Sequence, residues 1–218
     1  HTTFHNWMIA TNCDEIEVPD DVIGSVPGQL LADGTKCKGI GDDRKPEQGD
    51  IKVLLGVSGN GDVFPVGSWT SHETWEEISA SLERKKIKFP DGTILVCDGE
   101  PGLAEALSKH VSEQQRCHWH IVHDMYHMMW GDGGTKKDAK PVQDALKVIL
   151  AVELPKEDFE LVSEKQKDDI EQLMEDAEGY IDLLVKRLQQ KGYTKAANYL
   201  YRSKNHMFGY VRRWLSMG

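Results

Sequence analysis

The sequence lacks any apolar run that approaches the ~18 residues required to span a bilayer. It also lacks the basic, apolar and small-residue regions of a secretory signal peptide, and it contains no internal repeat and no low-complexity tract. We therefore expect no membrane partner. With 218 residues, of which 39% are hydrophobic and 28% charged, the composition is that of a globular protein with one large domain or one domain carrying a large insertion.

Cysteine is scarce and its spacing suggests no pairing. The four cysteines, Cys13, Cys37, Cys97 and Cys117, are far apart and form no Cys-x-x-Cys pair. Two of them fall in expected strands, which suits buried thiols better than a disulfide framework. The pattern indicates a reducing, intracellular setting.

Basic residues are outnumbered, since 36 acids stand against 26 lysines and arginines and the formal net charge is −10. This balance disfavours a protein that binds nucleic acid over its whole surface. It leaves room for local basic tracks, and the candidates for DNA contact are Arg84, Lys85, Lys86, Arg212 and Arg213. The alternative is that these residues are solvated faces that balance nearby acids.

The most informative stretch is the apolar run Ile94-Leu95-Val96-Cys97, which ends at Asp98 and Gly99. The run is short, contains two β-branched residues and is bounded by turn residues, so it predicts a buried strand. Asp98 then lies at the carboxyl end of a central strand, where open α/β sheets place their ligand chemistry.

Hydrophobic patterning places this strand in an α/β domain. We expect, in order, strands at 29–38, 51–58 and 63–70, a helix capped by Ser71, the strand 93–97, a helix from Glu100, a strand at 114–119 and a helix at 121–130. Three antiparallel strands followed by right-handed crossovers predict a mixed five-stranded sheet with helices on both faces.

Composition divides the chain into three regions. Residues 1–27 are mixed, with an acidic segment rich in turn residues from Asp14 to Pro27, and we interpret them as a linker or the end of a missing N-terminal part. Residues 28–130 form the expected sheet domain. Gly131-Asp132-Gly133-Gly134 is a break, after which only helical periodicity appears, most clearly from Ile170 to Leu188. We therefore predict an all-helical region at residues 131–218.

Asp33 lies in the middle of the first expected strand, beside Gly34. Because an unpaired carboxylate is costly in a buried strand, Asp33 is either a turn residue, which the Asp-Gly pair slightly favours, or a functional acid. If the first and fourth strands pair, Asp33 and Asp98 become neighbours. Two carboxylates at that distance bind Mg²⁺ or Mn²⁺, and such ions support phosphoryl transfer, normally with a third acid. The alternative is that both acids only serve turns.

A cluster of sulfur and imidazole ligands follows at Cys117, His120, His123 and His127. The spacings of three, three and four residues put the three histidines on one helix face, which is a conceivable zinc site. The alternative, which we favour because no second paired element is present, is that His123, Met125, His127 and Met128 pack a helix against the sheet, with Cys117 buried. His118 has no clear role.

Two segments, Ala32-Asp33-Gly34-Thr35-Lys36 and Cys97-Asp98-Gly99-Glu100 with the following Arg116-Cys117-His118-Trp119-His120, carry a family resemblance. With the strand order, they resemble the DDE transposases of the Mutator-like superfamily of insertion-sequence transposases, which have an RNase H-like catalytic core. In that group a Cys-x-x-His motif follows the second Asp, and an all-helical insertion precedes the catalytic Glu. Cys117 and His120 match the motif, and residues 131–218 match the insertion. The resemblance spans about Leu30 to Gly218.

The resemblance implies an α/β, RNase H-like fold and a DNA transposase that cuts and joins strands by divalent-metal-dependent phosphoryl transfer. Asp33 matches the first metal-binding Asp and Asp98 the second, with Mg²⁺ or Mn²⁺ as cofactor. Cys117 and His120 are expected to shape the active site or to contact DNA. The implied partners are transposon ends, target DNA and further copies of the chain, and the implied location is the nucleoid-associated cytoplasm of a prokaryote.

The third acid of the family has no match in this sequence. The acids Glu153, Glu157, Glu171, Glu175 and Glu178 fall on helix faces expected to be exposed. We therefore expect the chain to be a fragment that ends before the catalytic Glu and is inactive, or nearly so, by itself. Two alternatives stay open, a non-catalytic RNase H-like module that binds DNA or protein, and a hydrolytic nuclease on the same scaffold.

Overall fold

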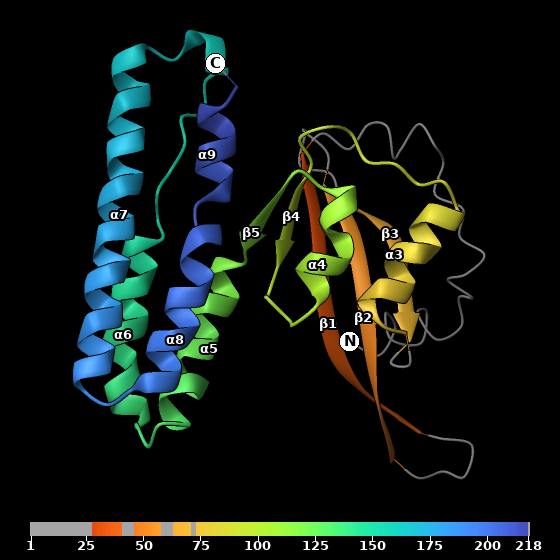
Figure 1. Ribbon diagram of the computed structural model, residues 1–218, viewed down its shortest axis with the longest axis horizontal. Coiled ribbons are helices and arrows are strands. Elements are labelled where there is room, and N and C mark those ends of the chain that lie inside the picture. Colours follow the sequence, from red (N-terminus) through yellow and green to blue (C-terminus); the bar gives the residue numbers. More distant parts are fainter. Residues whose placement is uncertain (1–27, 41–45, 58–62, 71–72, 218) are drawn as a thin grey trace. The chain divides into compact units, whose positions relative to one another are not determined.

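The computed structural model describes residues 28–40, 46–57, 63–70 and 73–217 (Figure 1). The chain divides between Gln114 and Gln115 into a sheet unit and a helical unit. None of the described helices is long and apolar enough to cross a membrane.

The sheet has five strands in the order β3-β2-β1-β4-β5. Their bounds are β1 (Gln29–Ile40), β2 (Pro46–Val57), β3 (Val63–Thr70), β4 (Ile94–Cys97) and β5 (Glu113–Arg116). β1 pairs antiparallel with β2 and parallel with β4, and β2 pairs antiparallel with β3. This mixed sheet confirms the predicted α/β fold class and is consistent with an RNase H-like fold. The predicted pairing of the first and fourth strands is also confirmed.

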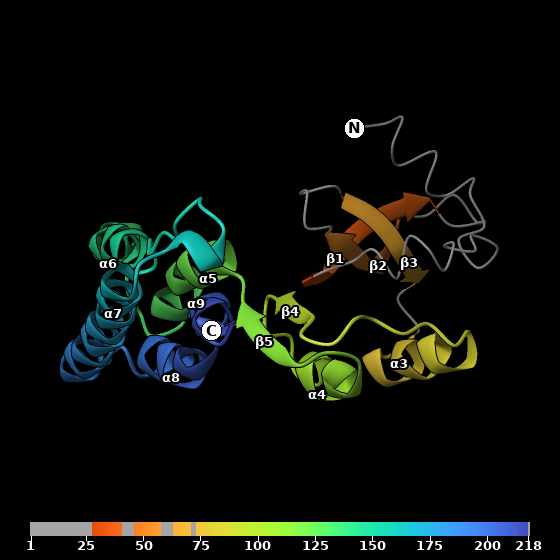
Figure 2. The ribbon, with the colours of Figure 1, turned by 90° about the horizontal axis from the view of Figure 1, so that it is seen from above.

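Helices α3 (Trp75–Arg84) and α4 (Leu103–Leu107) pack on one face of the sheet (Figure 2). Side chains alternate along a strand, so Leu30 and Ala32 of β1 point to the same face, where they join Leu54, Trp75 and Leu103 in one core cluster. The sequence predicted helices on both faces, but in the described part of the sheet unit both helices lie on this one.

Helix α3 begins later than the sequence suggested. Its N-cap is Thr74, whose hydroxyl accepts a hydrogen bond from the Glu77 amide while the Glu77 carboxylate accepts one from the Thr74 amide. This capping box satisfies two backbone donors at once. The prediction of a cap at Ser71, which lies outside the described residues, was therefore wrong.

The helical unit contains α5 (His118–Trp130), α6 (Lys136–Ile149), α7 (Glu164–Gln190), α8 (Thr194–Ser203) and α9 (Gly209–Leu215). α5 begins at His118 and β5 ends at Arg116, so the strand is shorter and the helix longer than predicted. All the secondary-structure elements described after Gly131 are helices, in agreement with the periodicity. The boundary between the predicted core and insertion stays a prediction.

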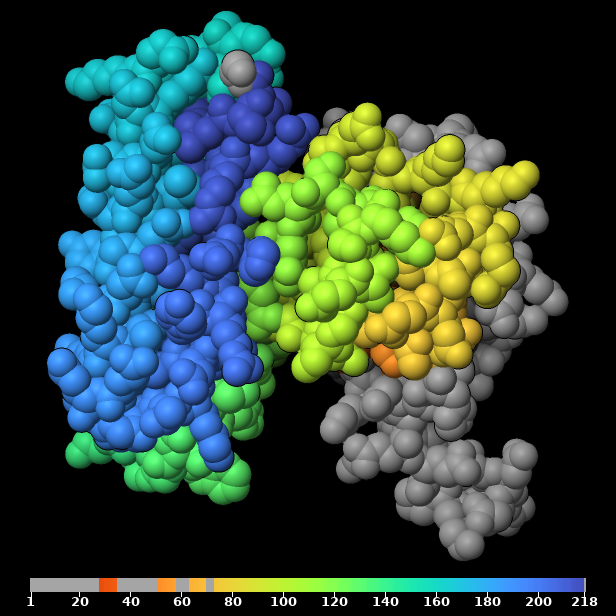
Figure 3. Space-filling model, in the orientation of Figure 1, coloured from red at the N-terminus to blue at the C-terminus, as the bar shows by residue number. Residues whose placement is uncertain are grey.

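Packing in the helical unit is organised by α7. Its buried residues recur every three or four positions, which gives one continuous apolar stripe: Ile170, Met174, Ala177, Ile181, Val185 and Leu188. The stripe joins a single core cluster with the buried residues of α5, α6, α8 and α9. Residues of α7 and α8 form part of the molecular surface that Figure 3 shows.

Replacing Ile181 by Ala tests this packing. Ile181 is fully buried, so Ile181→Ala should lower the free energy of unfolding by about 2–5 kcal/mol through lost burial and a residual cavity. Leu183 lies two residues away on the same helix and is 60% exposed, so Leu183→Ala should change stability by about 0.5 kcal/mol or less. Urea unfolding measures both, and equal effects would contradict the packing.

Candidate active site

Asp33 and Asp98 meet because β1 and β4 run parallel in one register. The last paired residues are Ala32 of β1 and Cys97 of β4, and the residue that follows each of them is an aspartate. Neighbouring strands lie about 4.8 Å apart, and residues paired in register point to the same side. The two carboxylates accordingly have oxygens within 4.8 Å of each other. Asp33 is exposed and Asp98 is half-buried.

Asp33 is not the turn residue that the Asp-Gly pair slightly favoured. β1 continues without interruption through Asp33, which pairs with Val53 of β2. Pairing on both sides of β1 overrides the local turn preference of the dipeptide. An exposed acid at the end of the β1–β4 pairing also avoids the burial cost that made a strand position look unfavourable.

Asp98 does occupy a turn. Its Oδ1 accepts a hydrogen bond from the Glu100 amide at 2.8 Å, and Gly99 has a φ of 84°, which glycine adopts without strain. The hydrogen bond holds the Asp98 carboxylate in a defined orientation at the end of β4. Asp98 can therefore serve the turn and still lie beside the Asp33 carboxylate.

Glu100, which the sequence did not single out, ties this turn to the rest of the sheet unit. Its Oε2 accepts a hydrogen bond from the indole Nε1 of Trp75 at 2.8 Å, and Trp75 is buried at the start of α3. A β-carbon on Gly34 would lie 3.4 Å from the same oxygen. The Glu100 carboxylate therefore lies beside Gly34 of β1. The backbone of Glu100 orients Asp98 while its side chain fixes the turn.

Two carboxylates this close are a chemically suitable pair of ligands for a divalent cation. Hard cations such as Mg²⁺ and Mn²⁺ prefer oxygen ligands, and a cation relieves the repulsion between two negative charges. In the sheet unit, Asp33 and Asp98 are the residues that can hold such an ion.

Cys117 and His120 belong to the helical unit. Cys117 is half-buried and is the N-cap of α5, although its side chain makes no capping hydrogen bond. His120 lies in the first turn of α5, and its Nδ1 is buried without a hydrogen-bond partner among the described residues. The Trp119 and His120 rings pack nearly perpendicular to each other at a centroid distance of 4.8 Å.

The structure gives no support to a zinc site in this cluster. Among the described residues, no three of Cys117, His120, His123 and His127 bring ligand atoms within 4.8 Å of one another. The rings of His123 and His127 lie 5.3 Å apart and pack as a tilted pair instead. Both imidazoles are exposed, so the interpretation that His123 and His127 pack the helix was wrong, and the two rings lie on the surface of α5.

His118 has a structural role that the sequence did not suggest. Its Nε2 lies 2.6 Å from the carbonyl oxygen of Met207, and a carbonyl only accepts, so Nε2 carries the proton. Burial disfavours the charged imidazolium and lowers the pKa of His118, while the hydrogen bond to Met207 partly opposes this shift. His118 therefore joins α5 to the segment before α9 as a neutral ring.

A second buried network holds the start of the helical unit. The Arg116 guanidinium is 7% exposed, packs on the Tyr199 ring and donates to the Tyr199 hydroxyl at 3.3 Å. That hydroxyl donates to Asp124 on α5 at 3.2 Å, and burial raises the pKa of Tyr199. The network joins the end of β5 to α5 and α8. Residues so distant in the sequence leave no local signal of this contact.

The predicted DNA contacts occupy two different settings. Arg84, Lys85 and Lys86 are exposed at the end of α3, where basic side chains also complement the helix dipole. Arg212 is half-buried, donates to the Asn205 carbonyl at 2.8 Å and forms an ion pair with Glu178. Arg213 is half-buried as well. The α3 group therefore offers charge to solvent, and Arg212 is engaged within the helical unit.

Comparison with known proteins identifies a family. The family model described as Transposase, Mutator family, matches residues 30–208, which cover most of the chain. A search of curated proteins with this chain found no match. The match confirms the resemblance predicted from the two aspartate segments and the Cys-x-x-His motif.

The hydrogen bond between Trp75 and Glu100 can be measured by a double-mutant cycle of Trp75→Phe and Glu100→Ala. The cycle cancels the packing that is lost with the indole, so it isolates the side-chain interaction. Hydrogen bonds to charged groups contribute about 1.5–3 kcal/mol, and partial exposure places this one at the lower end. Urea unfolding of the four proteins should give a coupling of about 1–2 kcal/mol. A coupling near zero would contradict the contact.

The neutral state of His118 predicts how stability depends on pH. Because its pKa is lower in the folded chain than the ordinary value of 6.5, the unfolded chain binds more protons just below that pH. This contribution to stability is complete above pH ~6.5 and declines as the pH falls toward the folded-state pKa. Titration of the His118 ring by NMR should give a pKa below 6.5. A value at or above 6.5 would show that the ring is not buried as described.

Proposed function

Because this chain belongs to the Mutator family of transposases, we propose that it takes part in cutting and joining DNA strands at a metal site held by Asp33 and Asp98. The family itself is that of DNA transposases, which act on DNA. The observation that carries the metal site is the approach of two carboxylates, within 4.8 Å, at the ends of adjacent parallel strands. The proposed cofactor is Mg²⁺ or Mn²⁺.

A divalent cation held by Asp33 and Asp98 would supply activation of a water or a 3′-hydroxyl and stabilisation of the leaving oxygen. The residues of this chain hold and orient the site. The Asp33 and Asp98 carboxylates supply negative oxygens, and the Glu100 amide keeps Asp98 turned in one direction. Trp75 donates a hydrogen bond to the Glu100 side chain and so helps to fix the turn that carries Asp98.

The remaining assignments extend this proposal. We place Cys117 and His120 near the reacting DNA, following the family motif, and Arg84, Lys85 and Lys86 against the DNA backbone, which agrees with their exposure. Arg212 and Arg213 are weaker candidates, since Arg212 is already paired with Glu178. An RNase H-like core at 28–130, a helical insertion at 131–218 and a homo-oligomer on DNA complete the proposal.

Replacing Asp98 by Asn tests the metal site with little change in shape. Asp98→Asn and Asp33→Asn should each weaken Mn²⁺ binding by at least tenfold, because each removes one of two charged ligands. Asp91 is exposed in a turn of the same unit, so Asp91→Asn is the matched control and should bind Mn²⁺ like the unchanged chain. Isothermal titration with Mn²⁺ measures all four proteins.

Catalysis is tested in the same variants by strand cleavage and strand transfer on labelled DNA with Mg²⁺ or Mn²⁺. In a protein that carries all three acids, Asp98→Asn should reduce both products by at least a hundredfold. Retained activity would refute the assignment of Asp98. Nicked products without joined ends would instead identify a hydrolytic nuclease, and Mn²⁺ binding without any cleavage would identify a non-catalytic module.

A further inference from the structure

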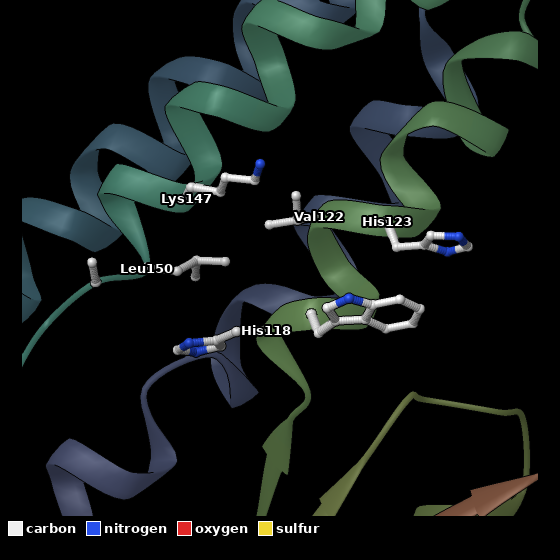
Figure 4. A pocket seen from close by; sticks show the side chains of 7 residues that line it. His118, Val122, His123, Lys147 and Leu150 are labelled. Atoms are coloured by element: carbon white, nitrogen blue, oxygen red, sulfur yellow. The ribbon is translucent and has the colours of Figure 1, made fainter.

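The helical unit has an open pocket of about 440 Å³ between α5 and the end of α6. Trp119, Val122 and His123 line it from α5, and Lys147 and Leu150 line it from α6 and its C-cap. In Figure 4 the side chains of Lys147 and Leu150 extend toward Val122 on the facing helix. The pocket thus has an apolar floor, one aromatic residue and one cation. None of these residues has a part in the metal site.

Trp119 is the unusual member of this group, because its large apolar side chain is 64% exposed. Its indole stacks on the His123 imidazole with a centroid distance of 4.6 Å and an angle of 12° between the rings. One helical turn separates the two residues, so the stack is built into α5. His123 covers one face of the indole and the His120 ring lies perpendicular to it, and the 64% exposure is that of the surface these two contacts leave open. The ring is therefore held in place and is available for stacking.

Lys147 supplies the only positive side chain among the described residues that line the pocket, apart from imidazoles. Its Nζ lies 3.9 Å from Asp144 Oδ1, at the limit of an ion pair, and the same oxygen is bound more closely by Lys140 at 2.5 Å. Lys147 is also 61% exposed in its side chain. Its ammonium group is thus weakly held and can bind an anion without breaking a strong contact.

A fixed aromatic face beside an accessible cation is the combination that recognises a nucleotide with an exposed base. Bases stack on aromatic side chains whatever their sequence, and a lysine next to the stack binds the phosphate. In a paired duplex the bases are covered by their neighbours, so only an unpaired base can use the indole. The apolar floor formed by Val122 and Leu150 suits the ring of a base better than a hydrated ion.

We propose that this pocket binds an unpaired nucleotide of a DNA strand, with the base stacked on Trp119 and its phosphate at Lys147. The proposal rests on the proposed function for the identity of the ligand as DNA. It requires nothing of the Asp33–Asp98 site, so the two fail or succeed in separate experiments.

The first test measures binding of the chain to a fluorescein-labelled duplex that carries three unpaired adenines, by fluorescence anisotropy in the presence of EDTA. Trp119→Ala should weaken this binding about tenfold, which corresponds to the loss of one base–aromatic stack, and Trp119→Phe should restore most of it. Trp130 is 67% exposed on the same helix but does not line the pocket, so Trp130→Ala is the matched control and should bind normally.

A second probe separates stacking from electrostatic attraction. It is the same duplex with abasic sites in place of the three adenines, which keeps the phosphates and removes the bases. Trp119→Ala should bind this probe as well as the unchanged chain does. Lys147→Ala should weaken binding to both probes and lower the slope of log K against log salt by about 0.7, the value for one phosphate contact on a single strand. Lys137→Ala, an exposed lysine of α6 outside the pocket, is its control.

Several results would overturn the proposal. One is equal binding of the unchanged chain to the duplex with three unpaired adenines and to a fully paired duplex. The others are an equal loss for Trp119→Ala and Trp130→Ala, or a loss for Trp119→Ala on the abasic probe. Circular dichroism of each variant excludes unfolding as a cause, and the exposure of Trp119 makes unfolding an unexpected outcome. Failure of Mn²⁺ binding in the chain would refute the metal site and leave this pocket standing.

Discussion

The parallel register of β1 and β4 is the constraint on which the candidate site depends. This register pairs Ala32 with Cys97, so the two strands deliver Asp33 and Asp98 to the same edge of the sheet in the same orientation. A slip of one residue would turn one carboxylate to the opposite face, where the core side chains Leu30, Leu95 and Trp75 are buried. The hydrophobic alternation of β1 therefore protects the geometry of the acids as well as the core.

The surroundings of Asp33 and Asp98 differ. Asp33 is exposed, which keeps its carboxylate hydrated, and Asp98 accepts the Glu100 amide. A buried pair would be costly to keep ionised. Glu100 adds a third carboxylate to the region, but its Oε2 is bound by the Trp75 indole on the core side. Glu100 thus fixes the turn, while Asp33 and Asp98 are the two acids whose oxygens lie within 4.8 Å of each other.

Particular elements show where sequence reasoning succeeded and where it did not. β3 has the predicted bounds, because its alternating pattern is flanked by clear turn residues. The helix cap was predicted at Ser71 instead of Thr74, because both positions offer a hydroxyl followed by acids, and the reciprocal bonds between Thr74 and Glu77 are a feature of the folded helix. Asp33-Gly34 resembled a turn, since a local reading takes no account of the strands that pair on both sides of β1.

The sequence by itself determined the order of strands and helices and the family. It also indicated that Asp33 and Asp98 would be neighbours. These features depend on periodicity and on short motifs within a few residues. Only the tertiary structure decided the rest. The hold of Trp75 on Glu100, the neutral bridge from His118 to Met207 and the pocket shared by Trp119 and Lys147 each join residues 25 or more positions apart. Such contacts arise from the packing of whole elements, and no local pattern encodes them.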